Sequence, residues 1–427
     1  MDLHNNQNSV LGCCDGAAKK FSDQNKGHLS ETVYACWLDR IPTIGPVCIK
    51  HLLAEYQSAE QLYRLPESEI SGLAQSRLLT AAQAEKLREY QTDSRYEPWQ
   101  LYEDMTARGI HPVRYEDESY PNRLRAIPDP PRILYVKGGI PDEAGPSVGI
   151  VGARLCSDYG RYTARKFSYT LARAGVQIIS GMALGIDGIS HKAAIEAGGR
   201  TFAVLGCGAD VCYPEENRDI YEQIQTQGGV ISEYPPGTSP HAGLFPRRNR
   251  IISGLTDLLL VIEARKKSGT LITVDAALEQ GREVYALPGR VTDALSGGCN
   301  RLIAQGAGIA TSPEELLEEL RELRRYGADC GSETKGTAKV MRATENARTA
   351  GVVRPGETSK VQAELEHGTE AERLIYALLS EDGQTMDMLM SRSVLSPGIF
   401  SESLMHLCIS GRAVLRQGRY YRGGMEA

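Results

Sequence analysis

Residues 147–152 read SVGIVG, a short run that is apolar at almost every position. The run lacks the alternation of polar and apolar residues that is typical of a strand with one solvated face. Comparable runs follow, with helical patterns between them: VQIIS at 176–180, TFAVLG at 201–206, GVISEY at 229–234, DLLLVIEA at 257–264 and EVYALPG at 283–289. Strands that are buried on both faces and alternate with helices predict an α/β fold with a doubly wound parallel sheet.

Ligands of such a sheet bind at the carboxyl ends of the strands, in the loops that open the helices. The first of these loops contains Gly152, Ala153 and Arg154, which offer close backbone approach and one guanidinium group to a phosphate. A salt bridge between Arg154 and a neighbouring carboxylate is the structural alternative. The loop has no GxGxxG motif and no acidic residue ends the second strand, so a nicotinamide cofactor is disfavoured.

The second loop, SGMALGIDGISHKAA at 180–194, begins with Ser180 and Gly181. Its glycines allow the backbone to approach a ligand or another helix. Asp187 and His191 are four residues apart and share one helix face, as an acid/base pair would. Because no nucleophile accompanies them, we favour a structural role in which Asp187 caps the helix and His191 pairs with it.

The sequence FPRRNRIISGL at 245–255 concentrates positive charge at the start of a predicted helix. Arg247, Arg248 and Arg250 are electrostatically disfavoured there, because a helix N-terminus is already positive. Their presence indicates that an anion neutralises them, while Phe245 lies in a loop where a core role is not automatic. The apolar residues that follow are expected to anchor the helix.

A second basic segment, EARKKSGTLIT at 263–273, places Lys267 and Ser268 before another predicted helix. It resembles the end of a nucleotide-binding loop, but the upstream GxxxxG is missing, so ATP binding by a Walker loop is excluded. Residues 241–270 hold six lysines or arginines against two acids, a local charge of +4 in a chain of net charge −6. Cations beside an exposed aromatic ring are typical of single-stranded nucleic-acid binding.

The flanking segments differ in composition from residues 100–324, which hold the sheet. We expect a disordered lead at 1–29, a helical domain at 30–95, a flexible linker at 325–368 and a winged-helix module at 369–427. Within the helical domain, IPTIGPVCIKHLL is typical of a helix-hairpin-helix whose turn amides could face a phosphate. A plain helical hairpin that packs on its own core is an equally good interpretation.

The remaining features of the chain set limits on its class. Ten cysteines occur without CxxC or other zinc-ligand spacing, so reduced thiols are expected and no metal site is predicted. The N-terminus lacks the pattern of a secretory signal, and no stretch of about 18 uncharged apolar residues predicts a membrane span. We therefore expect a cytoplasmic protein with no cofactor.

Taken in order, VGARLCSDYG, SGMALGID, VLGCGADVCYP, ISEYPPGTSPHAGLFPRRNRIISGL, KSGTLIT and ALPGR resemble the motifs of the DNA-processing protein A family, DprA/Smf. The resemblance is dense over residues 100–311. It implies a Rossmann-like domain that binds and protects single-stranded DNA and helps to load the RecA recombinase onto it in natural transformation. It also implies a homodimer formed through this domain, a helix-hairpin-helix (SAM-like) N-terminal domain and no enzymatic reaction.

The resemblance also assigns site residues, which together are expected to form the DNA groove. These are Gly152, Arg154, Ser180, Gly181, Phe245, Arg247, Arg248, Asn249, Arg250, Lys267 and Ser268. Ala153 departs from the pattern, since serine is frequent there, and a phosphate hydrogen bond would be lost. The alternative function is a nucleotide-processing enzyme on a related sheet, such as a phosphoribohydrolase, although its PGGxGTxxE signature is missing here.

Overall fold

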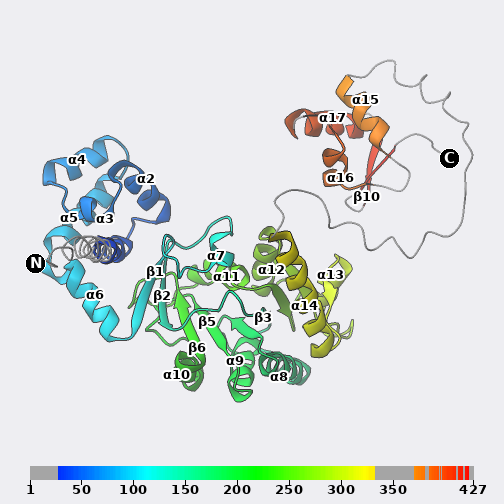
Figure 1. Cartoon of the computed structure of the whole chain (residues 1–427), viewed down its shortest axis with the longest axis horizontal. Helices are drawn as coiled ribbons and strands as arrows, with labels where there is room; N and C mark the ends of the chain where they lie inside the picture. The colour runs from blue at the N-terminus through cyan, green and yellow to red at the C-terminus, as the bar shows by residue number, and fades with distance from the viewer. Residues whose placement is uncertain are drawn as a thin grey trace, which may run out of the picture. The chain divides into compact units, whose positions relative to one another are not determined.

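The computed structural model describes residues 27–331, 370–379, 384–393, 395, 397–409, 412–416 and 419–422. The chain divides into two compact units, Met1–Lys335 and Gly336–Ala427 (Figure 1). The first unit holds a nine-stranded sheet in the order β1-β2-β6-β5-β4-β3-β7-β8-β9. Its strands are β1 (Ile110–Arg114), β2 (Ile133–Gly138), β3 (Ser147–Val151), β4 (Gln177–Ser180), β5 (Thr201–Leu205), β6 (Gly228–Ser232), β7 (Leu258–Val261), β8 (Glu283–Ala286) and β9 (Gly308–Ile309).

The seven strands from β3 to β9 are mutually parallel, which confirms the predicted α/β class with a large, mostly parallel, Rossmann-like sheet. Two further strands extend one edge: β2 pairs antiparallel with β6, and β1 pairs antiparallel with β2. The strand order reverses at β3, whose neighbours are β4 on one side and β7 on the other. A crevice is expected at the carboxyl ends of β3 and β7, because the connections leave in opposite directions there.

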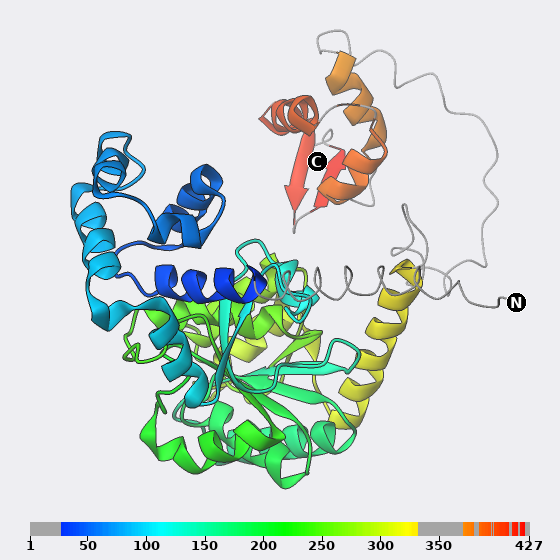
Figure 2. The same cartoon turned by 60° about the vertical axis from the view of Figure 1, so that its left-hand side comes forward.

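Helices cover both faces of this sheet, which explains why its strands are continuously apolar. Leu258 and Leu260 of β7 join a core with α8 and α14, whereas Leu259 and Val261 join a core with α11 and α12. In Figures 1 and 2, α8 (Asp158–Arg173), α9 (Ile186–Glu196) and α10 (Arg218–Gln227) lie along the lower side of the sheet. The remaining helices of the region are α7 (Asn122–Arg125), η2 (Glu215–Asn217), α11 (Leu244–Gly254), α12 (Thr270–Glu279), α13 (Gly297–Ala304) and α14 (Pro313–Gly331).

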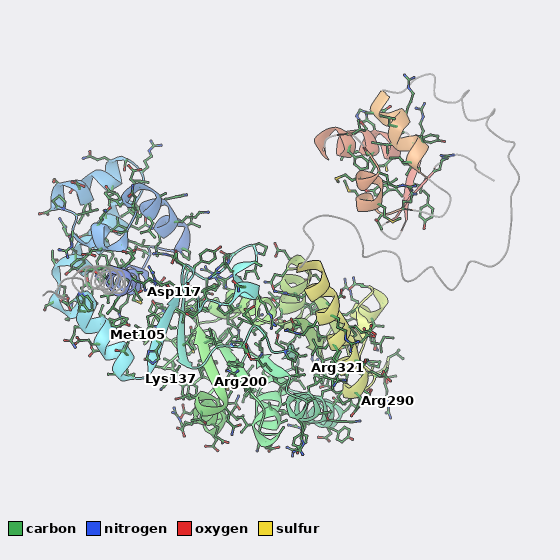
Figure 3. All side chains as sticks on the ribbon, viewed as in Figure 1. Met105, Asp117, Lys137, Arg200, Arg290 and Arg321 are labelled. Atoms are coloured by element: carbon green, nitrogen blue, oxygen red, sulfur yellow. The ribbon has the colours of Figure 1, made fainter. Side chains whose placement is uncertain are left out.

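The N-terminal helices share a hydrophobic core with the sheet. Residues 27–39 are helical, and α2 (Pro46–Tyr56), α3 (Ala59–Tyr63), α4 (Glu67–Gln75), α5 (Ala81–Thr92), η1 (Ser94–Tyr96) and α6 (Pro98–Ala107) follow. Met105 of α6, labelled in Figure 3, belongs to the same core as Leu205 of β5. The Tyr135 hydroxyl of β2 also donates to Asp39 Oδ2 at 2.8 Å. Residues 41–53 form the expected turn and second helix, with Lys50 exposed.

In the second unit, the described residues form three helices and then two paired strands. The helices are α15 (Glu370–Leu378), α16 (Met386–Ser391) and α17 (Pro397–Ile409). The strands β10 (Ala413–Arg416) and β11 (Arg419–Arg422) pair antiparallel. Ile375, Leu389 and Phe400 are among the buried side chains that form the core of this unit.

Helix α14 differs from the sequence-based expectation at its C-terminal end. It continues to Gly331, seven residues into the segment that we predicted as a linker from residue 325. Polar composition does not by itself stop a helix, and this stretch contains no proline that would end it. Most of the predicted linker, and nearly all of the predicted N-terminal lead, lie outside the described residues. In the described part of the chain, no helix is long and apolar enough to cross a membrane.

Candidate nucleic-acid interface

A pocket of ≈ 620 Å³ opens at the carboxyl ends of β3 and β7, where the strand order reverses. Loops after β3, β4 and β5 contribute to it, and so do the first turns of α11 and α12. Its polar and aromatic lining includes Arg154, Asp187, Tyr213, Phe245, Arg248, Asn249, Ser268 and Thr270. The topology therefore brings together segments that are more than 100 residues apart in the sequence.

Two aromatic rings form one wall of this pocket. The ring centroids of Tyr213 and Phe245 are 5.7 Å apart with an interplanar angle of 27°. The guanidinium carbon of Arg154 lies 5.7 Å from the Phe245 ring centroid, and Tyr213 is 44% exposed. Gly206 leaves space for the Phe245 ring, because a Cβ at that position would lie 2.7 Å from the Phe245 Cδ1 atom. The wall thus presents aromatic faces and the exposed Arg154 guanidinium group to a ligand.

Tyr213 was not among the predicted site residues. In the sequence it stands in VCYP, in the loop after the apolar run TFAVLG. An aromatic residue that follows the carboxyl end of a strand was the available signal.

The three arginines of residues 247–250 meet three different environments. Arg248 is 5% exposed, and its Nη1 atom donates to the carbonyls of Val204 and Gly181, the latter at 2.7 Å. A Cβ at Gly181 would lie 2.8 Å from the guanidinium group, so a larger residue there would displace the Arg248 side chain. Burial lowers the pKa of Arg248, while the nearby Asp187 carboxylate raises it. Arg248 therefore forms the floor of the pocket.

The other two arginines, Arg247 and Arg250, differ in their exposure and in their ion pairs. Arg247 is exposed, and its side chain has no ion pair within the described ranges of the chain. Arg250 has a side chain only 15% exposed and forms ion pairs with Glu233 at 2.7 Å and Asp129 at 3.1 Å. It does not line the pocket. Successive positions of a helix point in different directions, so the three arginines meet different surroundings. Arg247 is the one of the three that is available to bind an external anion.

The glycine and serine positions of the predicted groove have internal partners. The Ser180 hydroxyl is buried and donates to the Ile150 carbonyl at 2.6 Å, so this side chain does not line the pocket. Gly152 lines the pocket and also packs against Ile186 of α9. A Cβ at position 152 would lie 2.6 Å from the Ile186 Cγ1 atom. These two residues shape the strand ends beneath the site.

The loop before α12 contributes hydroxyl groups and exposed cations. The Ser268 hydroxyl donates to Thr270 Oγ1 at 3.1 Å, and the Thr270 hydroxyl donates to the Gly152 carbonyl at 3.2 Å. These contacts tie the loop after β7 to the loop after β3. Lys267 is exposed beside them, outside the pocket lining, and Asn249 lines the pocket from α11.

Asp187 and His191 do not act as the pair that the sequence suggested. The His191 Nδ1 atom lies 2.7 Å from the hydroxyl oxygen of Thr201, and the ring is fully buried. Burial lowers the pKa of His191 to about 3. Asp187 Oδ2 instead accepts a hydrogen bond from the Ala183 amide at 3.4 Å, and burial raises the pKa of this carboxyl. Both the acid/base interpretation and the predicted pairing with Asp187 are therefore wrong for His191.

Comparisons with known proteins place this site in a family. Residues 111–321 match the family model described as DNA recombination-mediator protein A. Protein Smf of Synechocystis is 32% identical over 406 residues, which cover 92% of this chain and 99% of that protein. The chain belongs to the DNA recombination-mediator protein A family, DprA/Smf. The resemblance inferred from the motifs is thereby confirmed.

Two proteins named DprA are also similar to this chain. DNA processing protein DprA of Bacillus subtilis is 43% identical over 215 residues, or 50% of this chain and 72% of that protein. The X-ray structure of DprA from Streptococcus pneumoniae is 34% identical with a TM-score of 0.58, covering 67% of this chain and 98% of that chain. The mixed α/β fold with its large, mostly parallel sheet is therefore shared with this relative.

Proposed function

We propose that this chain is a single-stranded DNA-binding recombination mediator whose pocket between β3 and β7 holds the DNA. The observation that carries the proposal is the Tyr213–Phe245 aromatic wall with Arg154 beside it. Aromatic faces stack on any base and cations follow the backbone, which suits sequence-independent binding of a single strand. A duplex, whose bases are already stacked, gains little from such a wall. Relatives named DNA processing protein support a role in DNA metabolism.

The geometry suggests a division of roles among the predicted residues. Phe245 and Tyr213 stack on bases, while the exposed cations Arg154, Arg247 and Lys267 contact phosphates. Gly152, Asn249 and Ser268 offer backbone or polar groups at the pocket lining. The remaining residues act indirectly: Arg248, Gly181 and Ser180 build the floor, and Arg250 fixes α11 against Glu233 and Asp129.

The alternative of a nucleotide-processing enzyme depends on Asp187. This buried carboxyl lines the pocket, and its raised pKa is a property that general acids share. His191, the nearest candidate partner in sequence, is bound to Thr201. We therefore propose a protein without an enzymatic reaction. Release of free base from a nucleoside monophosphate, lost in Asp187→Asn, would support the enzyme instead.

Several finer functions are proposed together with DNA binding. We propose that the bound strand is protected and passed to the RecA recombinase in the cytoplasm, during natural transformation or other recombination. The helices and hairpin of Gly336–Ala427 support a winged-helix module, and the turn at residues 41–53 supports a helix-hairpin-helix domain. A homodimer through the sheet domain is proposed from the family resemblance, and analytical ultracentrifugation of the full chain tests it.

The binding proposal is tested with a fluorescent 20-nucleotide single strand and its duplex over a salt series. Tight single-strand binding with a steep salt slope, and weak duplex binding, are expected. Each phosphate contact contributes about 0.7 to the slope for a single strand, so Arg247→Ala should lower the slope by about that amount. Equal affinity for both DNA forms, or none for either, would overturn the proposal.

A further inference from the structure

Helix α8 presents an exposed surface in which aromatic and basic side chains alternate. Tyr162, Lys166, Tyr169 and Arg173 follow one another at i, i+4, i+7 and i+11, so they lie along one face of the helix. All four are exposed, with Tyr162 at 64% and Tyr169 at 37%. The opposite face, which includes Phe167 and Leu171, is buried against the sheet. We name these four residues the α8 stripe.

The composition of this stripe is unusual for the chain. In the described part of the molecule five aromatic side chains are exposed, and three of them, Tyr159, Tyr162 and Tyr169, lie on α8. A fourth is Tyr213 of the pocket wall. Exposed aromatic rings therefore gather at the pocket and on one adjoining helix. Such clustering marks an interaction surface, because single apolar residues are otherwise scattered over a protein surface.

The cations of the stripe are available to a ligand. Helix α8 carries four basic residues and one acid in a chain of net charge −6. Arg165 is held by Glu196 and Arg161 lies 3.5 Å from Asp158. Lys166 and Arg173, by contrast, have no ion pair or side-chain hydrogen bond with any described residue. Lys166 lies between Tyr162 and Tyr169 on this face, and Arg173 follows Tyr169.

The stripe is continuous with the candidate site. Helix α8 begins at Asp158, four residues after Arg154 of the pocket, at the carboxyl end of β3. Leu155, which is 84% exposed, lies in the interval, and Tyr159, which is 46% exposed and donates its hydroxyl to the Pro288 carbonyl, is the second residue of α8. From Tyr159 to Arg173 the helix spans about 21 Å at 1.5 Å per residue. A strand with B-form spacing of about 3.4 Å would place roughly six nucleotides along it.

We propose that single-stranded DNA leaving the pocket continues along α8, with bases stacked on Tyr162 and Tyr169 and phosphates bound by Lys166 and Arg173. The inference rests on the proposed function of the pocket and extends it to a second, adjoining segment of DNA. Alternation of rings and cations is the chemistry of a sequence-independent single-strand track. The neighbouring α14 begins with Glu314 and Glu315 and carries further glutamates, so repulsion keeps the strand on α8.

The test compares a 6-nucleotide with a 20-nucleotide oligothymidylate on the full chain, by fluorescence anisotropy at matched salt. In Tyr162→Ala/Tyr169→Ala the affinity for the 20-mer should fall about 25-fold or more, because each of the two lost stacking contacts contributes at least about fivefold. In Lys166→Glu/Arg173→Glu the salt slope for the 20-mer should fall by about 1.4, from two lost phosphate contacts. A 6-mer is too short to occupy the pocket and the whole α8 stripe together, so its affinity should fall by less than that of the 20-mer.

Matched controls separate the track from the pocket and from the fold. Trp99→Ala removes an exposed ring of α6, and Arg88→Glu reverses an exposed charge of α5; neither should alter 20-mer binding. Unchanged 20-mer binding in both stripe variants would overturn the track while leaving the pocket proposal intact. An equal loss for the 6-mer and the 20-mer would also overturn it. If wild-type protein bound neither oligonucleotide, the proposed function itself would fail.

Discussion

Arg247 and Arg248 are adjacent in the sequence but are expected to serve opposite purposes. The buried guanidinium of Arg248 holds two backbone carbonyls and lies near the buried Asp187. Removing one member of a buried charged network typically costs about 3–5 kcal/mol of folding free energy. We predict that Arg248→Ala destabilises the protein by about this amount in urea denaturation, whereas Arg247→Ala changes stability by less than about 0.5 kcal/mol.

The affinity for DNA should also separate Arg247→Ala from Arg248→Ala. Arg247→Ala should retain the wild-type unfolding curve and still lose affinity with a lower salt slope. If Arg247→Ala were destabilised as much as Arg248→Ala, the placement of the two side chains would be contradicted.

His191 makes the stability of the fold sensitive to acid. Thr201 donates its hydroxyl proton to the Ile178 carbonyl, so its oxygen must accept from a neutral His191 that is protonated at Nδ1. The folded-state pKa, about 3, lies below the ordinary value of 6.5. Because the unfolded chain binds the proton first as pH falls, this stability is complete above pH 6.5 and is lost progressively towards pH 3.

At pH 5 the loss should reach about 2 kcal/mol. We predict that the difference in unfolding free energy between wild type and His191→Gln shrinks by that amount between pH 7.5 and pH 5. The pKa of Asp39 is also raised, to about 6, chiefly by burial, but both proteins carry Asp39 and its titration cancels in the difference. A pH-independent difference would contradict the burial of a neutral His191, because it would require the same pKa for this side chain in the folded protein and in the unfolded chain.

Sequence reasoning located the site segments better than it located individual side chains. Phe245 and Arg154 could be found, since an aromatic ring beside a basic cluster and an arginine at a strand end have few structural uses. The predicted loop position of Phe245 was wrong, because the residue lies in the first turn of α11. The partners of Arg250 could not, because Asp129 and Glu233 reach it only through the folding of distant segments. The burial of Arg248 depends on the orientation of α11, which one helical turn of sequence does not determine.

At the scale of elements, continuous apolar runs were sufficient to predict the parallel strands. The strands are apolar throughout because helices cover both faces of the sheet. In β7, Leu258 to Val261 alternate between two hydrophobic cores. The antiparallel edge was not predicted: β2 pairs with β6, and β1 pairs only with β2. Edge pairing depends on where the chain returns in space, and the local pattern carries no information about that.

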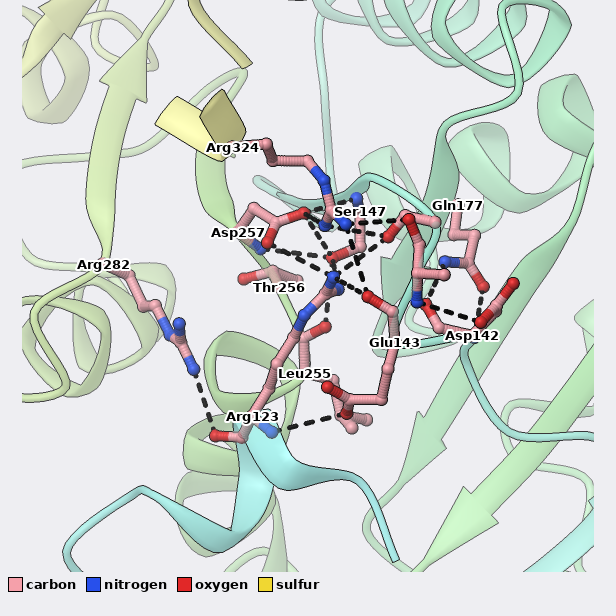
Figure 4. Close-up of polar contacts among 12 residues, drawn as sticks. Arg123, Asp142, Glu143, Ser147, Gln177, Leu255, Thr256, Asp257, Arg282 and Arg324 are labelled. Carbon is pink, nitrogen blue, oxygen red and sulfur yellow. Dashed lines mark hydrogen bonds and ion pairs between the residues drawn. The ribbon is translucent and has the colours of Figure 1, made fainter. Parts of the chain in front are cut away.

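Asp257 anchors elements at the end of the sheet that is opposite to the pocket (Figure 4). Its carboxylate lies 2.9 Å from Arg324 of α14 and 3.4 Å from Arg123, and it accepts the Ser147 amide of β3 at 2.9 Å. Without the Asp257 carboxylate, Arg123 and Arg324 would lose the negative charge with which both form ion pairs. We predict that Asp257→Ala costs about 3 kcal/mol of unfolding free energy.

The same variant should leave DNA affinity unchanged, because Asp257 precedes β7 and the pocket lies beyond its other end. Asp158→Ala, at a fully exposed carboxylate of α8, is the control and should cost less than about 0.5 kcal/mol. Equal unfolding midpoints for the two variants in urea would contradict the anchoring role of Asp257.

At the scale of the molecule, every residue of the pocket belongs to the first compact unit. The second unit, Gly336–Ala427, has its own core around Phe400. We predict that a chain ending at Lys335 folds, unfolds cooperatively and binds single-stranded DNA with an affinity within about threefold of the full chain, since no pocket contact is removed. A larger loss would show that the second unit contributes to binding.

The central claim is that the pocket binds DNA by stacking on Phe245. The measurement that tests it most directly is the affinity of Phe245→Leu for a single-stranded oligonucleotide over a salt series, because leucine keeps an apolar side chain over Gly206 but has no aromatic face. We predict a loss of about tenfold, within the 1–3 kcal/mol of a stacked base, with an unchanged salt slope. Wild-type affinity in Phe245→Leu would contradict the account.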